Sequence, residues 1–291
     1  MIEVGDLTFT YPSARRSSAV EPTLKGLTFS IAEGEIFGFL GPSGAGKSTT
    51  QNILIRLLRG YAGSARVMGR ELSAWTPDYY AHIGVSFELP NHYLKLTARE
   101  NLTYFAALYG NTVHDPEAVL DWVGLANSAD KRVSDFSKGM KIRLNLARSI
   151  VHRPRILFLD EPTSGLDPVN SERIRQLVLR LAHEGTTVFV TTHNMQLADR
   201  LCDRVAFVAD GRISAIDAPG ALKKKYGRRV VRVEHSNGGD IHAEEFPLDA
   251  LGSNARFQEL IANGPSIQSI HSEEATLDAI FIDVTGQELT A

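Results

Sequence analysis

The most constraining feature of this 291-residue sequence is a glycine-rich run that separates an apolar stretch from an amphipathic one. The run consists of Gly41, Pro42, Ser43, Gly44, Ala45, Gly46, Lys47, Ser48 and Thr49. Glycines let a loop turn its backbone N–H groups toward an anion, and the start of a helix adds a favourable dipole end. Lys47 can reach the β- and γ-phosphates of a nucleotide, the Ser48 hydroxyl can ligate Mg²⁺, and Thr49 can donate to a further phosphate oxygen. The run therefore predicts a phosphate-binding loop between a strand at residues 34–41 and a helix at residues 46–58.

A second run, at residues 156–161, is an apolar strand that ends in two carboxylates. Asp160 suits the coordination shell of Mg²⁺, and Glu161 beside it suits the orientation or deprotonation of an attacking water. A further apolar run at residues 186–192 ends just before His193, at the edge of a parallel sheet where ligands bind. Strands that alternate with helices in this way predict a parallel sheet covered on both faces, and thus the α/β class.

Charge and hydropathy exclude several classes of protein. The net charge of −3 provides no broad basic field, so nucleic-acid binding is not expected. No window approaches the roughly 18 uninterrupted apolar residues of a membrane-spanning helix, and the first residues do not have the pattern of a signal peptide. Cys202 is the only cysteine, which excludes an internal disulfide and indicates a reducing compartment. The absence of an Asn-Lys-x-Asp base-reading motif argues against a GTPase.

The segment Phe136–Met140 lies just before the acidic strand and leads into an amphipathic helix. In this order of elements it resembles the signature motif of the nucleotide-binding domain of ABC transporters, which is usually Leu-Ser-Gly-Gly-Gln. Ser137 and Gly139 match that motif, whereas the other three positions depart from it, and Lys138 adds a cation. The resemblance covers residues 2–227 and implies an ATPase that uses ATP and Mg²⁺.

The same resemblance assigns roles to residues outside the phosphate-binding loop and the acidic strand end. It implies that the Ser137 hydroxyl and the Gly139 N–H contact the γ-phosphate of an ATP molecule held by the other subunit of a dimer. It places Tyr11 where the family stacks an aromatic ring on adenine. Asp167 resembles the central carboxylate of the loop that crosses the dimer interface, and His193 resembles the histidine that contacts the γ-phosphate.

Glu88 is the most informative departure from the family. It stands in the stretch from residue 83 to residue 102, which resembles the loop between the catalytic core and the helical subdomain, where the family usually has Gln. A Gln offers a neutral carbonyl, whereas Glu brings a charge that attracts Mg²⁺ and repels the γ-phosphate. Each of these energies is on the order of several kcal/mol at about 4 Å, and the sequence leaves open which prevails. Glu88 is therefore predicted as a variant catalytic and metal-binding residue.

The expected fold is a P-loop NTPase parallel sheet core with an antiparallel β subdomain and a helical subdomain, followed by a small C-terminal α+β domain. We expect the ATP-binding domain to span residues 1–227, with its helical subdomain at about residues 97–153. The polar insert at residues 13–21 is predicted as a loop, and the lysine-rich residues 223–227 as a linker. The C-terminal domain is expected at residues 228–291.

The C-terminal domain is predicted to contain a short strand at residues 230–233, a helix at about residues 253–262, a further strand and a last helix. That last helix follows Thr276 as its N-cap and has apolar residues at i, i+3, i+4 and i+7. The domain resembles extensions on the ATPases of drug- and antibiotic-exporting ABC systems. No catalytic group is evident in it, so it is expected to be a dimer-contact or regulatory module, or a stabilising appendage.

Together these features lead to one principal hypothesis about function. The chain is expected to be a peripheral subunit on the cytoplasmic face of the cell membrane that powers transport through an integral membrane permease. The resemblance favours multidrug export, that is, export of a drug-like or amphipathic compound. Two copies of the chain, or the chain and a paired second ATP-binding subunit, would share two ATP molecules. A non-transport nucleotide switch of the same superfamily is the main alternative, and a small-molecule kinase would leave Phe136–Met140 and His193 unexplained.

Overall fold

The computed structural model describes residues 1–12, 21–110, 113–227, 230–237, 240–263, 266–273 and 275–287. The chain divides into two compact units, of which the first contains Met1–Ala218 and Gln287, and the second contains Pro219–Gly286. Within the described ranges, no helix has both the length and the apolar character needed to cross a bilayer. The residues of the predicted insert from position 13 to position 20 lie outside the described ranges.

The first sheet of the larger unit is antiparallel. It contains β1 (Ile2–Phe9), β2 (Leu24–Ile31), β4 (Ala62–Val67) and β5 (Arg70–Glu71), in the order β2-β1-β4-β5. Along β1, alternate side chains such as Ile2 and Val4 are buried, as expected where one face of a sheet lies on the core. The predicted antiparallel β subdomain is confirmed.

The second sheet carries the predicted parallel strands. It contains β3 (Ile36–Leu40), β6 (Ile83–Ser86), β7 (Ile156–Asp160), β8 (Thr187–Thr192), β9 (Arg204–Ala209) and β10 (Arg212–Asp217), in the order β10-β9-β3-β8-β7-β6. All neighbouring pairs are parallel except β9 with β10. Every residue of β3 and of β8 is buried, which explains why neither strand alternates between apolar and charged side chains. The predicted α/β class is confirmed.

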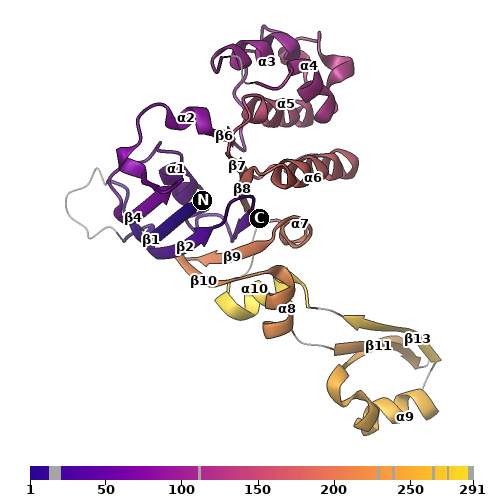
Figure 1. Ribbon diagram of the computed structural model, residues 1–291. Helices are drawn as coiled ribbons and strands as arrows, with labels where there is room; N and C mark the ends of the chain where they lie inside the picture. Colours follow the sequence, from indigo (N-terminus) through magenta and orange to yellow (C-terminus); the bar gives the residue numbers. More distant parts are fainter. Residues whose placement is uncertain are drawn as a thin grey trace. The chain divides into compact units, whose positions relative to one another are not determined.

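Aromatic side chains join the two sheets into one core. The rings of Phe29 on β2 and Phe37 on β3 stack with centroids 5.6 Å apart, and Phe189 on β8 lies 5.4 Å from Phe39. Figure 1 shows α1 (Lys47–Leu54), α6 (Pro168–His183) and α7 (Met195–Leu201) beside the parallel sheet. Helices α1 and α6 contact β8, and α7 contacts β3. The short α2 (Tyr79–His82) and the 3₁₀ turn η1 (Leu72–Ala74) precede β6.

Helix α1 is shorter than predicted, and helix α6 has a side-chain cap. Helix α1 ends at Leu54, short of the predicted residue 58, because Arg56 adopts a left-handed φ of 63°. The N–H groups of Leu57 and Leu58 then both donate to the Asn52 carbonyl instead of continuing the helix. Helix α6 begins at Pro168, because the Asp167 side chain accepts a hydrogen bond from the Asn170 N–H and caps it.

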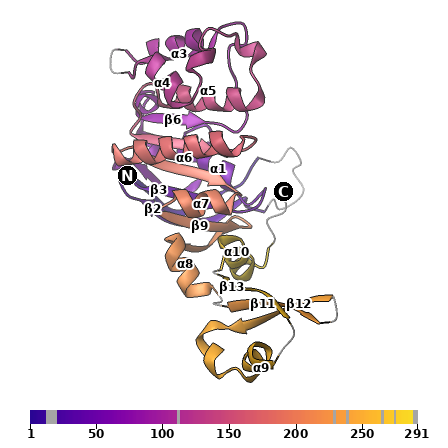
Figure 2. The same ribbon diagram turned by 90° about the vertical axis from the view of Figure 1, so that its right-hand side faces the viewer.

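The segment expected as a helical subdomain contains α3 (Ala98–Ala107), α4 (Pro116–Trp122) and α5 (Lys138–Ile150), with 3₁₀ turns η2 (Ala126–Ser128) and η3 (Val133–Asp135). Figures 1 and 2 show these three helices beside one another, and each contacts the other two. Helix α3 begins with a capping box, in which the Thr97 hydroxyl accepts from the Glu100 N–H and the Glu100 carboxylate accepts from the Thr97 N–H.

The smaller unit contains α8 (Pro219–Tyr226), β11 (Val230–Asn237), β12 (Asp240–Pro247), the 3₁₀ turn η4 (Leu248–Ser253), α9 (Ala255–Asn263), β13 (Ser266–Glu273) and α10 (Leu277–Thr285). Its antiparallel sheet has the order β12-β11-β13, and its core includes Val231, Val233, Phe246 and Leu260. The α+β character is as predicted, and the Thr276 hydroxyl caps α10. The prediction of a linker at residues 223–227 is wrong, because its lysines form the last turn of α8. Their positive charges stabilise the C-terminal end of this helix.

The boundary of the second unit also differs from the expected one after residue 227. Helix α8 packs against α10, so the unit begins at Pro219.

Thr97→Ala tests the start of the helical segment. The substitution removes the hydroxyl that accepts from the Glu100 N–H, so we expect a loss of about 1 kcal/mol in the free energy of unfolding. Urea titration followed by circular dichroism measures it. Thr103→Ala, at an exposed position of the same helix, is the matched control and should cost nothing. Equal losses in the two variants would contradict the capping role.

Candidate functional site

The phosphate loop connects the end of β3 with the start of α1, in the middle of the parallel sheet. Gly44 and Gly46 have φ angles of 83° and 104°, which only glycine adopts readily. At Gly41, an added Cβ would lie 2.1 Å from the Val208 carbonyl oxygen, so no side chain fits there. Helix α1 begins at Lys47 with neither a side-chain cap nor an acidic residue in its first turn. This loop and helix start therefore have the geometry of an anion cradle.

Lys47 is enclosed by the loop from which it extends. It is only 9% exposed, and its Nζ donates to the carbonyl oxygens of Gly41 at 2.6 Å and Pro42 at 2.9 Å. Burial lowers the pKa of Lys47, an effect that the nearby carboxylates of Glu161, Asp160 and Glu88 oppose. The ammonium group thus lies within electrostatic reach of three predicted acidic site residues.

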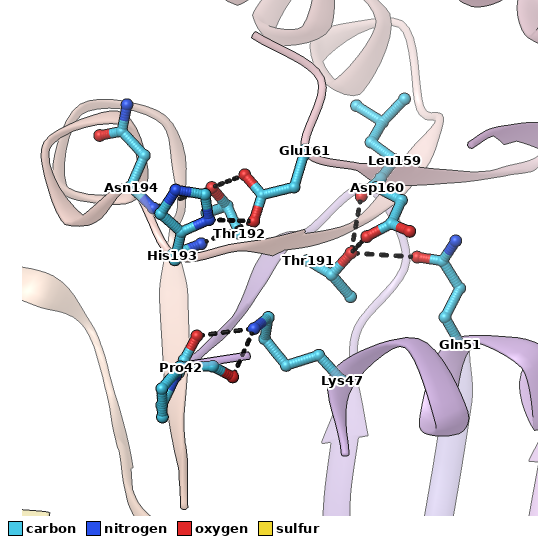
Figure 3. A network of polar contacts seen from close by, with 11 residues as sticks. Pro42, Lys47, Gln51, Leu159, Asp160, Glu161, Thr191, Thr192, His193 and Asn194 are labelled. Atoms are coloured by element: carbon cyan, nitrogen blue, oxygen red, sulfur yellow. Dashed lines mark hydrogen bonds and ion pairs between the residues drawn. The ribbon is translucent and has the colours of Figure 1, made fainter. Parts of the chain in front are cut away.

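Asp160 ends β7 beside the neighbouring strand β8. Its Oδ1 accepts a hydrogen bond of 2.5 Å from the Thr191 hydroxyl (Figure 3). Burial raises the pKa of Asp160, the Thr191 hydrogen bond lowers it, and the charges of Glu161 and Glu88 raise it further. A carboxylate with this combination of burial and acidic neighbours is stabilised in its charged form by a cation.

Glu161 follows Asp160 and turns toward the end of β8. Its φ of 47° lies in the left-handed region, uncommon for a residue other than glycine. Figure 3 shows its carboxylate between Thr192 and His193. Oε2 accepts from the Thr192 hydroxyl at 2.8 Å, and Oε1 accepts from the His193 backbone N–H at 2.9 Å and from its Nδ1 at 2.7 Å. Because a carboxylate only accepts, Nδ1 carries the hydrogen and Nε2 is the outer nitrogen of this half-exposed imidazole.

The remaining residues predicted to bind the nucleotide or Mg²⁺ on this chain lie in or around the phosphate loop. The Tyr11 hydroxyl hydrogen-bonds the Thr49 hydroxyl at 3.2 Å, and its ring, 44% exposed, packs edge-on against Phe9. Ser48 is exposed at the start of α1, as is Glu88 in the loop after β6. Within the rest of the loop Ser43 is exposed, Pro42 is half-buried and Ala45 is buried.

A second group of predicted residues lies apart from the phosphate loop. The Ser137 Oγ caps α5 by accepting from the Met140 N–H at 3.3 Å, and Asp167 caps α6. Two hydrogen bonds from Asn170, first from its N–H and then from its side chain, lower the pKa of Asp167. A Cβ at Gly139 would lie 3.2 Å from the Leu166 Cδ2, so the start of α5 touches the loop that contains Asp167. In the part of the chain that is described, no hydrogen bond or ion pair links this group with residues 41–49.

Three polar residues at the site were not predicted. Thr191 and Thr192 hold the two carboxylates, and their position directly before His193 at a strand end was the available signal. Asn145 on α5 is fully buried, and its Nδ2 donates to the Ser86 hydroxyl at 3.1 Å and the Phe87 carbonyl at 2.8 Å. Asn145 thereby fixes the start of the loop that carries Glu88.

Gly41→Ala tests the geometry of the phosphate loop. Because the new methyl group would meet the Val208 carbonyl, we expect a loss of about 3 kcal/mol or more in the free energy of unfolding. Gly44→Ala, in the same loop with nothing within 4 Å of its added Cβ, should cost about 1–2 kcal/mol through its positive φ alone. Chemical denaturation measures both, and equal losses would contradict the close approach at Gly41.

Comparisons with known proteins agree with this geometry. A family model described as ABC transporter matches residues 24–164, and one described as the fluoroquinolone efflux ABC transporter C-terminal domain matches residues 229–274. A fluoroquinolones export ATP-binding protein of Mycobacterium tuberculosis (strain CDC 1551 / Oshkosh) is 52% identical over 291 residues, which are 100% of this chain and 95% of that protein. The Nod factor export ATP-binding protein I of Rhizobium meliloti (strain 1021) is 39% identical, over 79% of this chain and 69% of its own.

Solved structures give the same result for the larger unit. A dimeric ATP-binding cassette in a post-hydrolysis state, bound to ADP and Pi, matches with a TM-score of 0.68 and 27% identity. The match covers 75% of this chain and 98% of that one. Sequence, fold and site geometry therefore lead to one conclusion: the chain belongs to the ABC transporter family, among its ATP-binding export proteins.

Proposed function

We propose that this chain binds and hydrolyses ATP to power export of a drug-like compound through a separate membrane permease. The observation that carries this proposal is the convergence of Lys47, Asp160, Glu161 and His193 at the carboxyl ends of β3, β7 and β8. A buried ammonium group, a metal-suited carboxylate and a hydrogen-bonded base are the parts that phosphoryl transfer to water requires.

ATP fits the cradle at Gly41–Thr49. The backbone N–H groups of the loop and Lys47 would hold the β- and γ-phosphates, and the Thr49 hydroxyl would hold a further phosphate oxygen. Tyr11 is tied to Thr49 by its hydroxyl, which keeps the ring close to the start of α1. We assign the exposed face of that ring to stacking on adenine.

The residues present also fit Mg²⁺. In the described ranges no cluster of three His, Cys, Asp or Glu residues is arranged to hold a metal by itself. This agrees with an ion that takes most ligands from phosphate and water and one or two from the protein. We assign Ser48 and Asp160 as its ligands, and Glu88 as a third group that adds negative charge. When bound, Mg²⁺ would neutralise charge on the phosphate oxygens.

Glu161 is the proposed general base. It would accept a proton from water as the water oxygen bonds to the γ-phosphorus, while the bond from that phosphorus to the β–γ bridging oxygen breaks and ADP leaves. Its three hydrogen bonds from Thr192 and His193 fix the direction of the carboxylate. We propose that the outer nitrogen of His193, Nε2, contacts the γ-phosphate.

A second cassette would complete each site. Ser137 and Asp167 are exposed and lie at the starts of α5 and α6, in a group that, among the described residues, has no polar link to the phosphate loop of its own chain. A helix start with a hydroxyl suits a phosphate, so Ser137 and Gly139 of one cassette would contact the γ-phosphate held by the other. The partner is a second copy of this chain or a paired ATP-binding subunit, and ATP would favour closure through its higher affinity for the closed dimer.

The permease is proposed to dock on the helical segment. A cavity of about 470 Å³ lies between the loop after β6 and helices α3 and α5, and its lining combines aromatic and aliphatic side chains with polar ones such as Arg148. Its lining includes Phe87, Tyr93 and Phe105, and Phe87 and Tyr93 are exposed. Such a surface suits an amphipathic helix of a membrane protein, which would hold this chain at the cytoplasmic face. We assign the smaller unit to dimer contact or regulation.

The cargo assignment rests on the relatives. The 52% identical protein is named for fluoroquinolone export and aligns with the whole chain, including the smaller unit. We therefore propose a fluoroquinolone or a similar aromatic, amphipathic drug as the exported compound.

Glu161→Gln should separate binding from hydrolysis. The variant keeps the shape of the side chain but cannot take a proton, so we expect turnover to fall by about 10²-fold or more while ATP affinity is unchanged. It should also accumulate as a dimer with ATP on gel filtration. Phosphate release and calorimetry measure the two effects.

The controls for this test isolate the carboxylate. Glu184→Gln, at the exposed end of α6, should behave as the wild type. Lys47→Ala should instead lose nucleotide affinity, because its ammonium is assigned to the phosphates. Normal turnover in Glu161→Gln would show that Glu161 is not the general base. Binding of ATP without turnover in the wild type would favour a nucleotide switch.

Export can be tested with the native partner. Purification of the chain from native membranes should recover an integral membrane protein, and the complex in vesicles should hydrolyse ATP faster when a fluoroquinolone is added. Vesicles that contain the Glu161→Gln chain should not accumulate the drug. Recovery of a ribosome or a soluble enzyme as the main partner would contradict the proposed coupling to transport.

A further inference from the structure

Two consecutive threonines at the end of β8 each hold one residue of the acidic pair. Thr191 and Thr192 are both 0% exposed. The Thr191 hydroxyl lies 2.5 Å from Asp160 Oδ1, and the Thr192 hydroxyl lies 2.8 Å from Glu161 Oε2 (Figure 3). Successive strand residues point to opposite faces of a sheet, so the two hydroxyls reach different carboxylates.

The direction of the hydrogen bond at Thr192 follows from its surroundings. Its Oγ1 accepts from the Asn194 backbone N–H at 3.0 Å, so its single hydrogen is directed to the Glu161 carboxylate. His193 supplies the two donors on the other oxygen, Oε1. With both oxygens occupied, the carboxylate plane of Glu161 is fixed from two sides.

Three oxygen atoms of described residues lie near the Thr191 hydroxyl and can accept its hydrogen. The carbonyl oxygen of Leu159 and Oε1 of Gln51 both lie 3.4 Å from its hydroxyl, much farther than Asp160. The single hydrogen therefore goes to the carboxylate, because a charge-assisted bond is the shorter and stronger one. Gln51 belongs to α1 and is 1% exposed, so the same cluster also touches the helix that follows the phosphate loop.

We propose that Thr191 and Thr192 are positioning residues with separate tasks. Thr191 orients Asp160 for Mg²⁺, and Thr192 orients Glu161 for the attacking water. Neither hydroxyl is assigned a contact with ATP. This inference rests on the proposed function, since it divides the metal-binding and the proton-accepting tasks of that site between two buried hydroxyls.

Thr192→Val tests the second task. Valine keeps the branched shape but has no hydroxyl, so we expect kcat for ATP hydrolysis to fall about tenfold while KM for ATP is unchanged. Thr192→Ser retains the donor and should recover most of the activity. In a Glu161→Gln background, Thr192→Val should leave the residual single-turnover rate unchanged, because the carboxylate through which it acts is already gone.

Thr191→Val tests the first task by binding rather than turnover. In the Glu161→Gln background, the Mg²⁺ concentration for half-maximal binding of a fluorescent ATP analogue should rise about tenfold. Thr191→Ser should restore it. Thr192→Val should not change this Mg²⁺ concentration, and this contrast separates the two tasks.

Thr187→Val is the matched structural control. Thr187 is equally buried at the opposite end of β8, where its hydroxyl accepts from the Gly34 N–H at 2.9 Å. The Thr187→Val substitution should lower the unfolding temperature without changing kcat or the Mg²⁺ concentration required for ATP binding. If the wild type hydrolyses ATP and Thr192→Val equals it, or serine does not rescue either site, the positioning roles are wrong and the proposed function stands. A wild type that binds ATP without turnover would overturn both.

Discussion

The site depends on the parallel pairing of β8 with β3 on one side and β7 on the other. Leu40 lies opposite Thr192 in one pair, and Asp160 lies opposite Thr191 in the other. This register brings the residue before the phosphate loop, the acidic pair and His193 to a common edge of the sheet. Strands β3 and β8 are buried along their whole length, so a shift in register would displace both the core and the chemistry. The packing of the phenylalanine side chains between the two sheets therefore also stabilises the geometry of the site.

Much of this arrangement was predictable from the sequence because its signals are local. A glycine loop between strand and helix, and two carboxylates after an apolar strand, each occupy consecutive positions, and the structure has the expected strand and helix around both. The α/β class followed from the alternation of elements. The C-terminal α10 was predictable from Thr276 and the helical spacing of its apolar residues.

Other features could not be predicted because they depend on neighbours distant in the sequence or on backbone dihedrals. The early end of α1 results from one left-handed residue, Arg56, which carries no glycine signal. The lysines of α8 resemble a linker in composition, and the contact of α8 with α10 lies more than 50 positions away along the chain. The hydroxyls of Thr191 and Thr192 acquire significance from Asp160 and Glu161, which lie 31 positions earlier in the chain. The catalytic and binding roles of all the predicted site residues, Glu88, Ser137 and Asp167 among them, stay predictions.

Helix α5 couples two regions mechanically, because it extends from the exposed Ser137 to the loop after β6. Ser137 caps its start, whereas Asn145 and Arg148 on its later turns donate hydrogen bonds to the Phe87 and Asn91 carbonyls beside the cavity after β6. A straight helix of this length measures about 20 Å and bends little, so it acts as a stiff rod rather than a hinge. A push of a few ångströms at the cavity end would move the serine tip by a comparable amount, without any rearrangement in between.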